Sequence, residues 1–128
     1  MDTEQYNKVG HQILDSCFQV HKELVPGLLE SVYHYALLKE LEIREIAVKS
    51  KVSVPLFYKG FNTGKHFELD ILVCDEIIIE IKAVEILHPV FSAQIISYLK
   101  LTKIKLGYLV NFNVPVLKDG FKRFVNNF

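Results

Sequence analysis

Apolar and polar residues alternate along residues 67–82, and a polar break at residues 74–76 divides this stretch into two short runs. Such runs around a polar break predict a β-hairpin. Because side chains alternate between the two faces of a strand, odd and even positions separate. The odd positions form one unbroken apolar face, made of Phe67, Leu69, Ile71, Val73, Ile77, Ile79 and Ile81. The even positions bring the charges of Asp70, Glu80 and Lys82 to the opposite face.

The register of this hairpin decides whether the charged residues meet. A three-residue loop at 74–76 pairs Val73 with Ile77 and sets Asp70 opposite Glu80. A two-residue loop would pair Ile71 with Glu80 and turn Asp70 to the other side, because a slip of one residue reverses every side chain. Only the first register keeps the odd-position apolar face continuous, and we therefore predict it.

Helical spacing dominates the N-terminal third of the chain. Asp2 or Thr3 can cap a helix that runs to about residue 24. Its apolar positions recur at spacings of three and four, at Tyr6, Val9, Ile13, Cys17, Val20 and Leu24. The Pro26-Gly27 pair ends this helix. A second helix is predicted from about residue 28 to residue 44.

The rest of the chain predicts a sheet and one more helix. Residues 48–58 form a strand in which Pro55 cannot donate to a ladder, so the strand lies at an edge or carries a bulge. A turn follows at residues 60–64. Pro89 begins a third helix that runs to about residue 102. A buried strand at 105–112 and a short element at 121–125 complete the chain. This order predicts an α/β fold, a mixed β-sheet flanked by α-helices in one domain covering residues 1–128.

Composition narrows the functional classes. The 128 residues are 50% hydrophobic, and fifteen basic and fifteen acidic residues give a net charge of zero. No field of the whole molecule attracts nucleic acid, so any such binding needs a local patch. The polar start and the absence of an apolar run of about 18 residues predict no signal peptide and no contact with a membrane. Two distant cysteines without metal spacing suit a reducing compartment, so we expect a cytoplasmic location.

Two facing carboxylates, those of Asp70 and Glu80, give the strongest indication of chemistry. Their charges repel, so either one of them is protonated or a cation neutralises them. With the backbone carbonyl of Ile81 they form an all-oxygen ligand set that suits Mg²⁺ or Mn²⁺. Lys82 would lie beside a metal-bound water, where it orients or deprotonates that water or stabilises charge on a phosphorane.

Two helical residues add to this candidate site. Glu30 lies at the border of the buried face of the second helix, and it is either a further metal ligand or a partner of the ligands. Gln94 in the third helix is placed to hold the water or Lys82. Each of the two residues also has a simpler explanation. Glu30 is equally explained as an acid in the first turn of a helix that complements the helix dipole, and Gln94 as a polar residue on the flank of a helix.

These residues carry a resemblance to a known family. Asp70, nine residues, and then Glu80-Ile81-Lys82 resemble the D…ExK signature of the PD-(D/E)XK nuclease superfamily. The chain is also similar to the bacterial proteins named after the motif GxxExxY, which corresponds here to residues 27–33. The similarity continues through residues 69–73, 79–83, 93–99, 107–112 and 117–120.

The resemblance implies a restriction-endonuclease-like fold and a metal-dependent hydrolase of nucleic-acid phosphodiester bonds, with DNA as the expected partner. It implies roles for five residues: metal binding by Asp70 and Glu80, the catalytic lysine Lys82, the helix-borne acid Glu30 and the accessory residue Gln94. The chain departs from the pattern at two positions. Leu69 stands where the superfamily name has proline, and Val25 stands where related proteins place glycine.

Three other interpretations remain open. In the first, Lys82 forms a structural ion pair with Asp70 or Glu80 and there is no metal. In the second, the nuclease-like fold is a non-catalytic module that binds nucleic acid or protein. In the third, the protein hydrolyses a small phosphorylated molecule. A homodimer is a further expectation, since so small a domain offers little surface to span a duplex.

Overall fold

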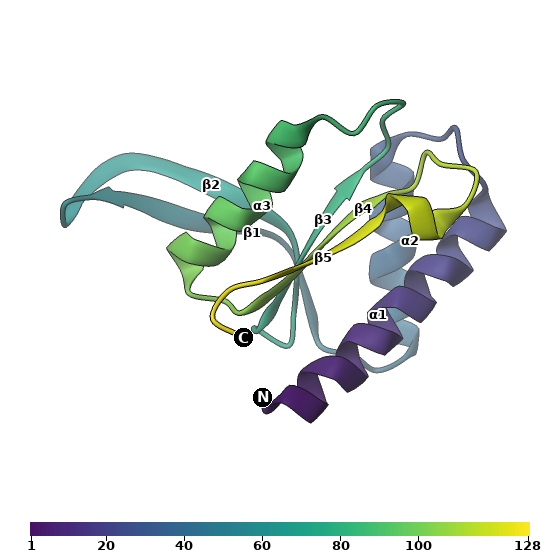
Figure 1. Cartoon of the computed structure of the whole chain (residues 1–128), viewed down its shortest axis with the longest axis horizontal. Coiled ribbons are helices and arrows are strands. Elements are labelled where there is room, and N and C mark those ends of the chain that lie inside the picture. Colours follow the sequence, from purple (N-terminus) through teal and green to yellow (C-terminus); the bar gives the residue numbers. More distant parts are fainter.

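A computed structural model describes residues 1–128 as one mixed sheet with three α-helices (Figure 1). In chain order the elements are α1 (Thr3–Leu24), α2 (Glu30–Ile43), β1 (Val48–Tyr58), β2 (Phe61–Val73), β3 (Ile77–Lys82), α3 (Pro89–Thr102), β4 (Leu106–Asn111), a 3₁₀ turn (Leu117–Gly120) and β5 (Phe121–Val125). The strands lie side by side in chain order, and only the β3–β4 pair is parallel. The predicted α/β fold class is confirmed.

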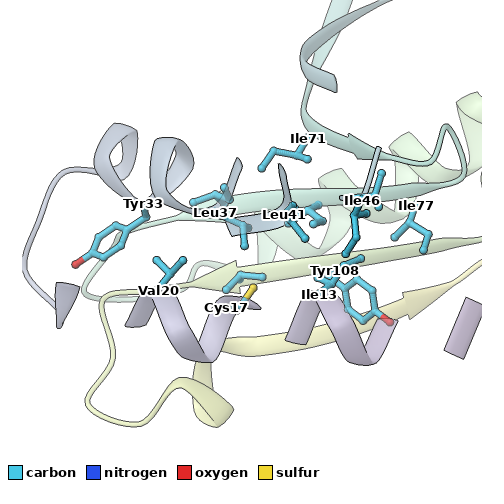
Figure 2. Close-up of a cluster of buried hydrophobic side chains, with 14 of the residues drawn as sticks. Ile13, Cys17, Val20, Tyr33, Leu37, Leu41, Ile46, Ile71, Ile77 and Tyr108 are labelled. Atoms are coloured by element: carbon cyan, nitrogen blue, oxygen red, sulfur yellow. The ribbon is translucent and has the colours of Figure 1, made fainter. Parts of the chain in front are cut away.

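Helices cover the two faces of the sheet unequally. On one face, α1 and α2 enclose a cluster of 18 buried residues that includes Cys17, Leu37 and Tyr108 (Figure 2). On the other face, α3 covers a cluster of four buried residues, Leu69, Leu72, Ile78 and Leu99. None of the helices combines the length and the apolar character needed to span a membrane.

The helix boundaries follow local capping chemistry. The Asp2 carboxylate accepts a hydrogen bond from the Gln5 N–H at 2.8 Å, and the Gln5 side chain accepts one from the Asp2 N–H, which forms a capping box at the start of α1. His88 accepts a hydrogen bond from the Val90 N–H just before α3. The second helix begins at Glu30, two residues later than predicted, because Leu29 still has an extended backbone.

The hairpin of β1 and β2 confirms two predictions and corrects a third. β1 is an edge strand, and its register with β2 shifts between Pro55 and Phe57. The predicted turn at residues 60–64 is wrong, since the turn is Lys59-Gly60 and β2 already begins at Phe61. Both turn residues have positive φ, 47° and 83°, which is the conformation of a type I′ hairpin turn, and glycine takes the second position without strain.

The hairpin of β2 and β3 has the predicted register. Val73 pairs with Ile77 and Ile71 pairs with Ile79 across the loop at 74–76. The single apolar face is wrong, however, because Phe67 and Leu69 pack in the cluster beneath α3, while the remaining odd positions lie in the larger cluster. β2 pairs with β3 only from residue 71 to residue 73 and otherwise forms a two-stranded ribbon with β1. The change of face between Leu69 and Ile71 falls where the pairing of β1 with β2 skips Lys51 and Asp70, and Lys51 has a φ of 53°.

Candidate active site

Asp70 and Glu80 face each other where β2 and β3 separate. The Asp70 N–H donates a hydrogen bond to Glu80 Oε2 at 2.8 Å, and the Ile81 N–H donates one to Asp70 Oδ2 at 2.8 Å. The last backbone pair of the two strands is Ile71 with Ile79, so the carboxylates take the place of the next ladder hydrogen bonds. Each acid is therefore fixed by the backbone of the opposite strand.

Burial makes this pair of acids electrostatically unfavourable. Glu80 is only 4% exposed, in a protein whose other buried residues are nearly all apolar. Burial, and secondly the charge of Asp70, raise the pKa of Glu80 to about 8, although the Asp70 N–H and Lys82 act in the opposite direction. A carboxyl group that is hard to ionise in isolation is the kind of group that a bound cation would ionise.

The donor atoms of this pair fit a hard divalent cation. Each carboxylate uses one oxygen to accept a backbone N–H, and its other oxygen makes no hydrogen bond within the protein. The N–H and C=O groups of a strand residue point to the same side, so the Ile81 carbonyl is directed toward Asp70. No three His, Cys, Asp or Glu side chains form a metal cluster. Mg²⁺ is commonly held by one or two carboxylates and keeps several waters, so the residues present fit it.

Lys82 lies on the same face of β3 as Glu80, and its ammonium is 4.5 Å from the centroid of the Phe91 ring in α3. It makes no ion pair, so the alternative of a structural ion pair with Asp70 or Glu80 is not formed in this structure. The positive charge of Lys82 lowers the pKa of both Glu80 and Glu30. Lys82 is thus close to the acids and is still free to meet a ligand.

The strand exit beyond Lys82 is held by a buried asparagine. Asn111 pairs with Lys82 in the parallel ladder of β3 and β4. Its side-chain oxygen accepts from the Val84 N–H at 3.0 Å, and its amide nitrogen donates to the Val84 carbonyl at 2.9 Å. These bonds fix the course of the chain directly after Lys82. No pattern within the sequence predicts this role for Asn111.

Glu30, in the first turn of α2, is close enough to Asp70 and Lys82 for their charges to change its pKa. Partial burial raises the pKa of Glu30, Asp70 raises it further, and Lys82 and His34 lower it. Although the residue stays accessible to solvent on one side, its carboxylate does not complete a three-acid cluster with Asp70 and Glu80. Its role as a metal ligand, or as a partner of the ligands, stays a prediction.

Tyr33 holds the loop that leads to Glu30. Its hydroxyl donates to the Val25 carbonyl at 2.6 Å and accepts from the Leu28 N–H at 3.1 Å. Its ring stacks on Phe112, with the centroids 4.9 Å apart. The spacing of glycine, glutamate and tyrosine in residues 27–33 therefore closes a loop and places an acid at the start of α2.

Tyr98 approaches the acids from α3, and the exposed Gln94 lies beside the Tyr98 hydroxyl. Burial, followed by the charges of Glu80 and Asp70, raises the pKa of the Tyr98 hydroxyl, and the nearby Gln94 side chain lowers it. The Tyr98 ring stacks on Phe67, with the centroids 4.4 Å apart. The patterns in the sequence did not assign Tyr98 to the candidate site, but its hydroxyl lies near the acid pair. Its position one helical turn after Gln94 was the available signal.

Comparison with protein-family models matches residues 7–124 to the PD-(D/E)XK nuclease superfamily. A search of curated proteins and a search of solved structures found no match. The matched region includes all three helices and five strands apart from their outermost residues, and it contains Asp70, Glu80 and Lys82. The chain belongs to the PD-(D/E)XK nuclease superfamily.

Proposed function

We propose that the protein is a metal-dependent nuclease that hydrolyses phosphodiester bonds of DNA, with Mg²⁺ or Mn²⁺ as its cofactor. One observation supports this most strongly, the pairing of buried Glu80 with half-buried Asp70 by two reciprocal hydrogen bonds. Burial, and secondly the charge of Asp70, raise the pKa of Glu80 to about 8, so ionising Glu80 in the absence of a cation is costly. Structural needs alone would favour apolar residues at such positions.

The proposed roles follow the position of each residue. Asp70 and Glu80 hold the ion with the oxygens that the backbone leaves free, and the Ile81 carbonyl adds a third oxygen. The ion supplies Lewis acidity and lowers the pKa of a water molecule. Lys82 is positioned by the Phe91 ring to stabilise the negative charge that develops on the scissile phosphate.

The helices complete the proposed site. Gln94 and the Tyr98 hydroxyl orient the attacking water from α3, and Glu30 supports the ligands from α2. We further propose that the chain belongs to the GxxExxY group within the superfamily, a proposal supported by the loop-closing hydrogen bonds of Tyr33.

Cleavage of labelled DNA and RNA in Mg²⁺ or Mn²⁺ tests this proposal, together with the metal affinity of the Glu80→Ala variant. We expect cleavage to fall by on the order of 10²-fold or more in this variant, and Mn²⁺ binding to weaken in parallel. Glu68→Ala is the matched control, because Glu68 is an exposed acid two residues before Asp70 on the same strand.

Two negative results together would contradict the proposed nuclease. If purified protein leaves every nucleic acid intact, and Glu80→Ala binds Mn²⁺ as the unchanged protein does, the proposed nuclease is wrong. A partner that binds equally well to Lys82→Ala would then indicate the non-catalytic module. Competition by free nucleotides but not by polynucleotides would indicate a small phosphorylated substrate.

A further inference from the structure

The outer parts of β1 and β2 form a two-stranded arm (residues 51–67) that projects from the body of the molecule (Figure 1). Beyond Pro55 on β1 and His66 on β2, the residues of this arm are exposed apart from the half-buried Leu56. β2 pairs with β3 only over residues 71–73, so no further strand supports the arm. The core of the fold does not explain its length.

Charge is distributed unequally between the arm and the rest of the molecule. Residues 48–67 contain four lysines and no acid, in a chain whose net charge is zero. Lys49, at the base, pairs with Asp75 at 2.8 Å. The remaining three, Lys51, Lys59 and Lys65, make no ion pair. The arm therefore carries the local positive patch that a nucleic-acid ligand requires.

The tip of the arm exposes aromatic rings. Phe57, Tyr58 and Phe61 are 57%, 65% and 76% exposed. Tyr58 and Phe61 pair directly across the two strands, so their side chains lie on the same face. The Lys59 ammonium is 5.5 Å from the centroid of the Tyr58 ring. Exposed rings combined with cations form the kind of surface on which unpaired bases stack.

The arm is continuous with the candidate active site. Phe61 and Asp70 lie nine residues apart on the same strand, which corresponds to roughly 30 Å, or the length of about nine base pairs of a duplex. At the base of the arm, Phe67 stacks on Tyr98, whose hydroxyl lies near the acid pair. A strand of nucleic acid held by the tip therefore has a direct path along β2 to the acids.

We propose that this arm binds the nucleic-acid substrate, with Tyr58 and Phe61 stacking on unpaired bases and Lys51, Lys59 and Lys65 contacting phosphates. The inference rests on the proposed function and deepens it, because it assigns to the same site a substrate that contains unpaired bases. The clustering of lysines without acids favours nucleic acid over a protein partner as the occupant.

Binding in the presence of EDTA tests the arm separately from cleavage. The probes are a fluorescently labelled blunt duplex and the same duplex with a single-stranded overhang, measured by anisotropy. The double variant Tyr58→Thr/Phe61→Thr keeps residues that favour a strand, so the arm is retained. We expect this variant to bind the overhang probe at least about tenfold more weakly and the blunt duplex within about twofold of the unchanged protein.

The lysines have a separate signature. In the triple variant Lys51→Ala/Lys59→Ala/Lys65→Ala, we expect the slope of log affinity against log salt for the overhang probe to decrease by about 2, since each contact with a single strand contributes about 0.7. For the aromatic double variant Tyr58→Thr/Phe61→Thr, the matched control is Tyr35→Ala. Tyr35 is 67% exposed on α2 and lies 5.9 Å from the Lys39 ammonium, an arrangement similar to that of Tyr58 and Lys59.

Three results would overturn the inference. The first is equal affinity of the double variant and the unchanged protein for the overhang probe, and the second is a loss of affinity for the blunt duplex as large as that for the overhang probe. The third is binding of phosphatidylserine vesicles in place of both probes. Cleavage that persists in the double variant with affinity unchanged would overturn the arm and leave the nuclease intact. Arm-dependent binding without any cleavage in Mg²⁺ or Mn²⁺ would leave the arm and refute the nuclease.

Discussion

The two faces of the sheet differ in what they bury. The face under α1 and α2 holds 18 buried residues, and the only ionisable side chains among them are tyrosine and cysteine. The face under α3 holds a cluster of four, next to which the sheet buries Glu80 and leaves Asp70 and Lys82 half-buried. The same strand, β3, supplies both sets, since Ile77, Ile79 and Ile81 point one way and Ile78, Glu80 and Lys82 the other.

The face under α1 and α2 therefore supplies stability, and the face under α3 holds the groups that could carry out chemistry. The packed face removes apolar surface from water, which is the main favourable contribution to folding. The α3 face carries a buried carboxyl group with a pKa raised to about 8, which opposes folding whenever the group is charged. Substitutions on the two faces should therefore have opposite signatures, with loss of stability on one and loss of activity on the other.

The largest expected effect is on catalysis. Lys82→Ala removes the cation nearest to the acids, and cleavage should fall by on the order of 10²- to 10³-fold while Mn²⁺ binding is retained. Single-turnover cleavage and the melting temperature are the measurements. Lys39→Ala, at an exposed lysine of α2, is the control and should leave both unchanged. Equal rates for the two variants would remove Lys82 from the mechanism.

On the packed face, Leu37→Ala should have the second largest effect. Leu37 is fully buried among the residues of α1, α2 and the sheet (Figure 2). Loss of its side chain should lower the free energy of unfolding by about 2–5 kcal/mol, as measured by urea denaturation. Metal affinity at a temperature where the variant is folded should not change. A loss below about 1 kcal/mol would mean that this face is not the stabilising one.

The stability of the metal-free protein should depend on pH through Glu80. The pKa of this group is 4.5 in its unperturbed state and about 8 in the folded protein, so the folded state binds more protons between these values. Stability is therefore fully present below about pH 4.5 and is lost as the pH rises through about 8, by up to about 5 kcal/mol, because each unit of pKa difference corresponds to about 1.4 kcal/mol. Glu80→Gln should remove this dependence and be the more stable protein at pH 9. A flat profile for the unchanged protein would contradict the raised pKa.

The smallest effect concerns the loop before α2. Val25 has φ 57° and ψ 170°, a region that is essentially restricted to glycine, and its side chain is 57% exposed. Val25→Gly should therefore raise the free energy of unfolding by about 1 kcal/mol, after the entropic cost of glycine in the unfolded chain. Thermal melting measures this change in stability. Val116→Gly, at an exposed valine with φ −121°, is the control and should destabilise.

Local patterns in the sequence predicted much of this molecule. The Asp2 cap, the Pro89 start of α3 and the edge position of the Pro55 strand depend on neighbouring residues only, and all three are confirmed. The register that sets Asp70 opposite Glu80 is also confirmed, because a single loop length fixes it. These features need no knowledge of tertiary packing.

Features that depend on packing between distant elements were missed. The position of Tyr98 near the acids depends on how α3 crosses the sheet, whereas its spacing from Gln94 shows only that these two residues share a face of the helix. The break in the apolar face after Leu69 falls where the pairing of β1 with β2 is interrupted at Lys51 and Asp70. The anchoring of the Lys82 strand by Asn111 requires the parallel β3–β4 pair, whose partners are far apart in the chain.

The most direct test of the central claim is a crystal soaked in Mn²⁺ and measured at a wavelength where manganese scatters anomalously. The account predicts an anomalous peak in contact with one carboxylate oxygen of Asp70 and one of Glu80, and no such peak in Glu80→Ala. Absence of a peak between these acids at saturating Mn²⁺, with both side chains well ordered, would contradict it.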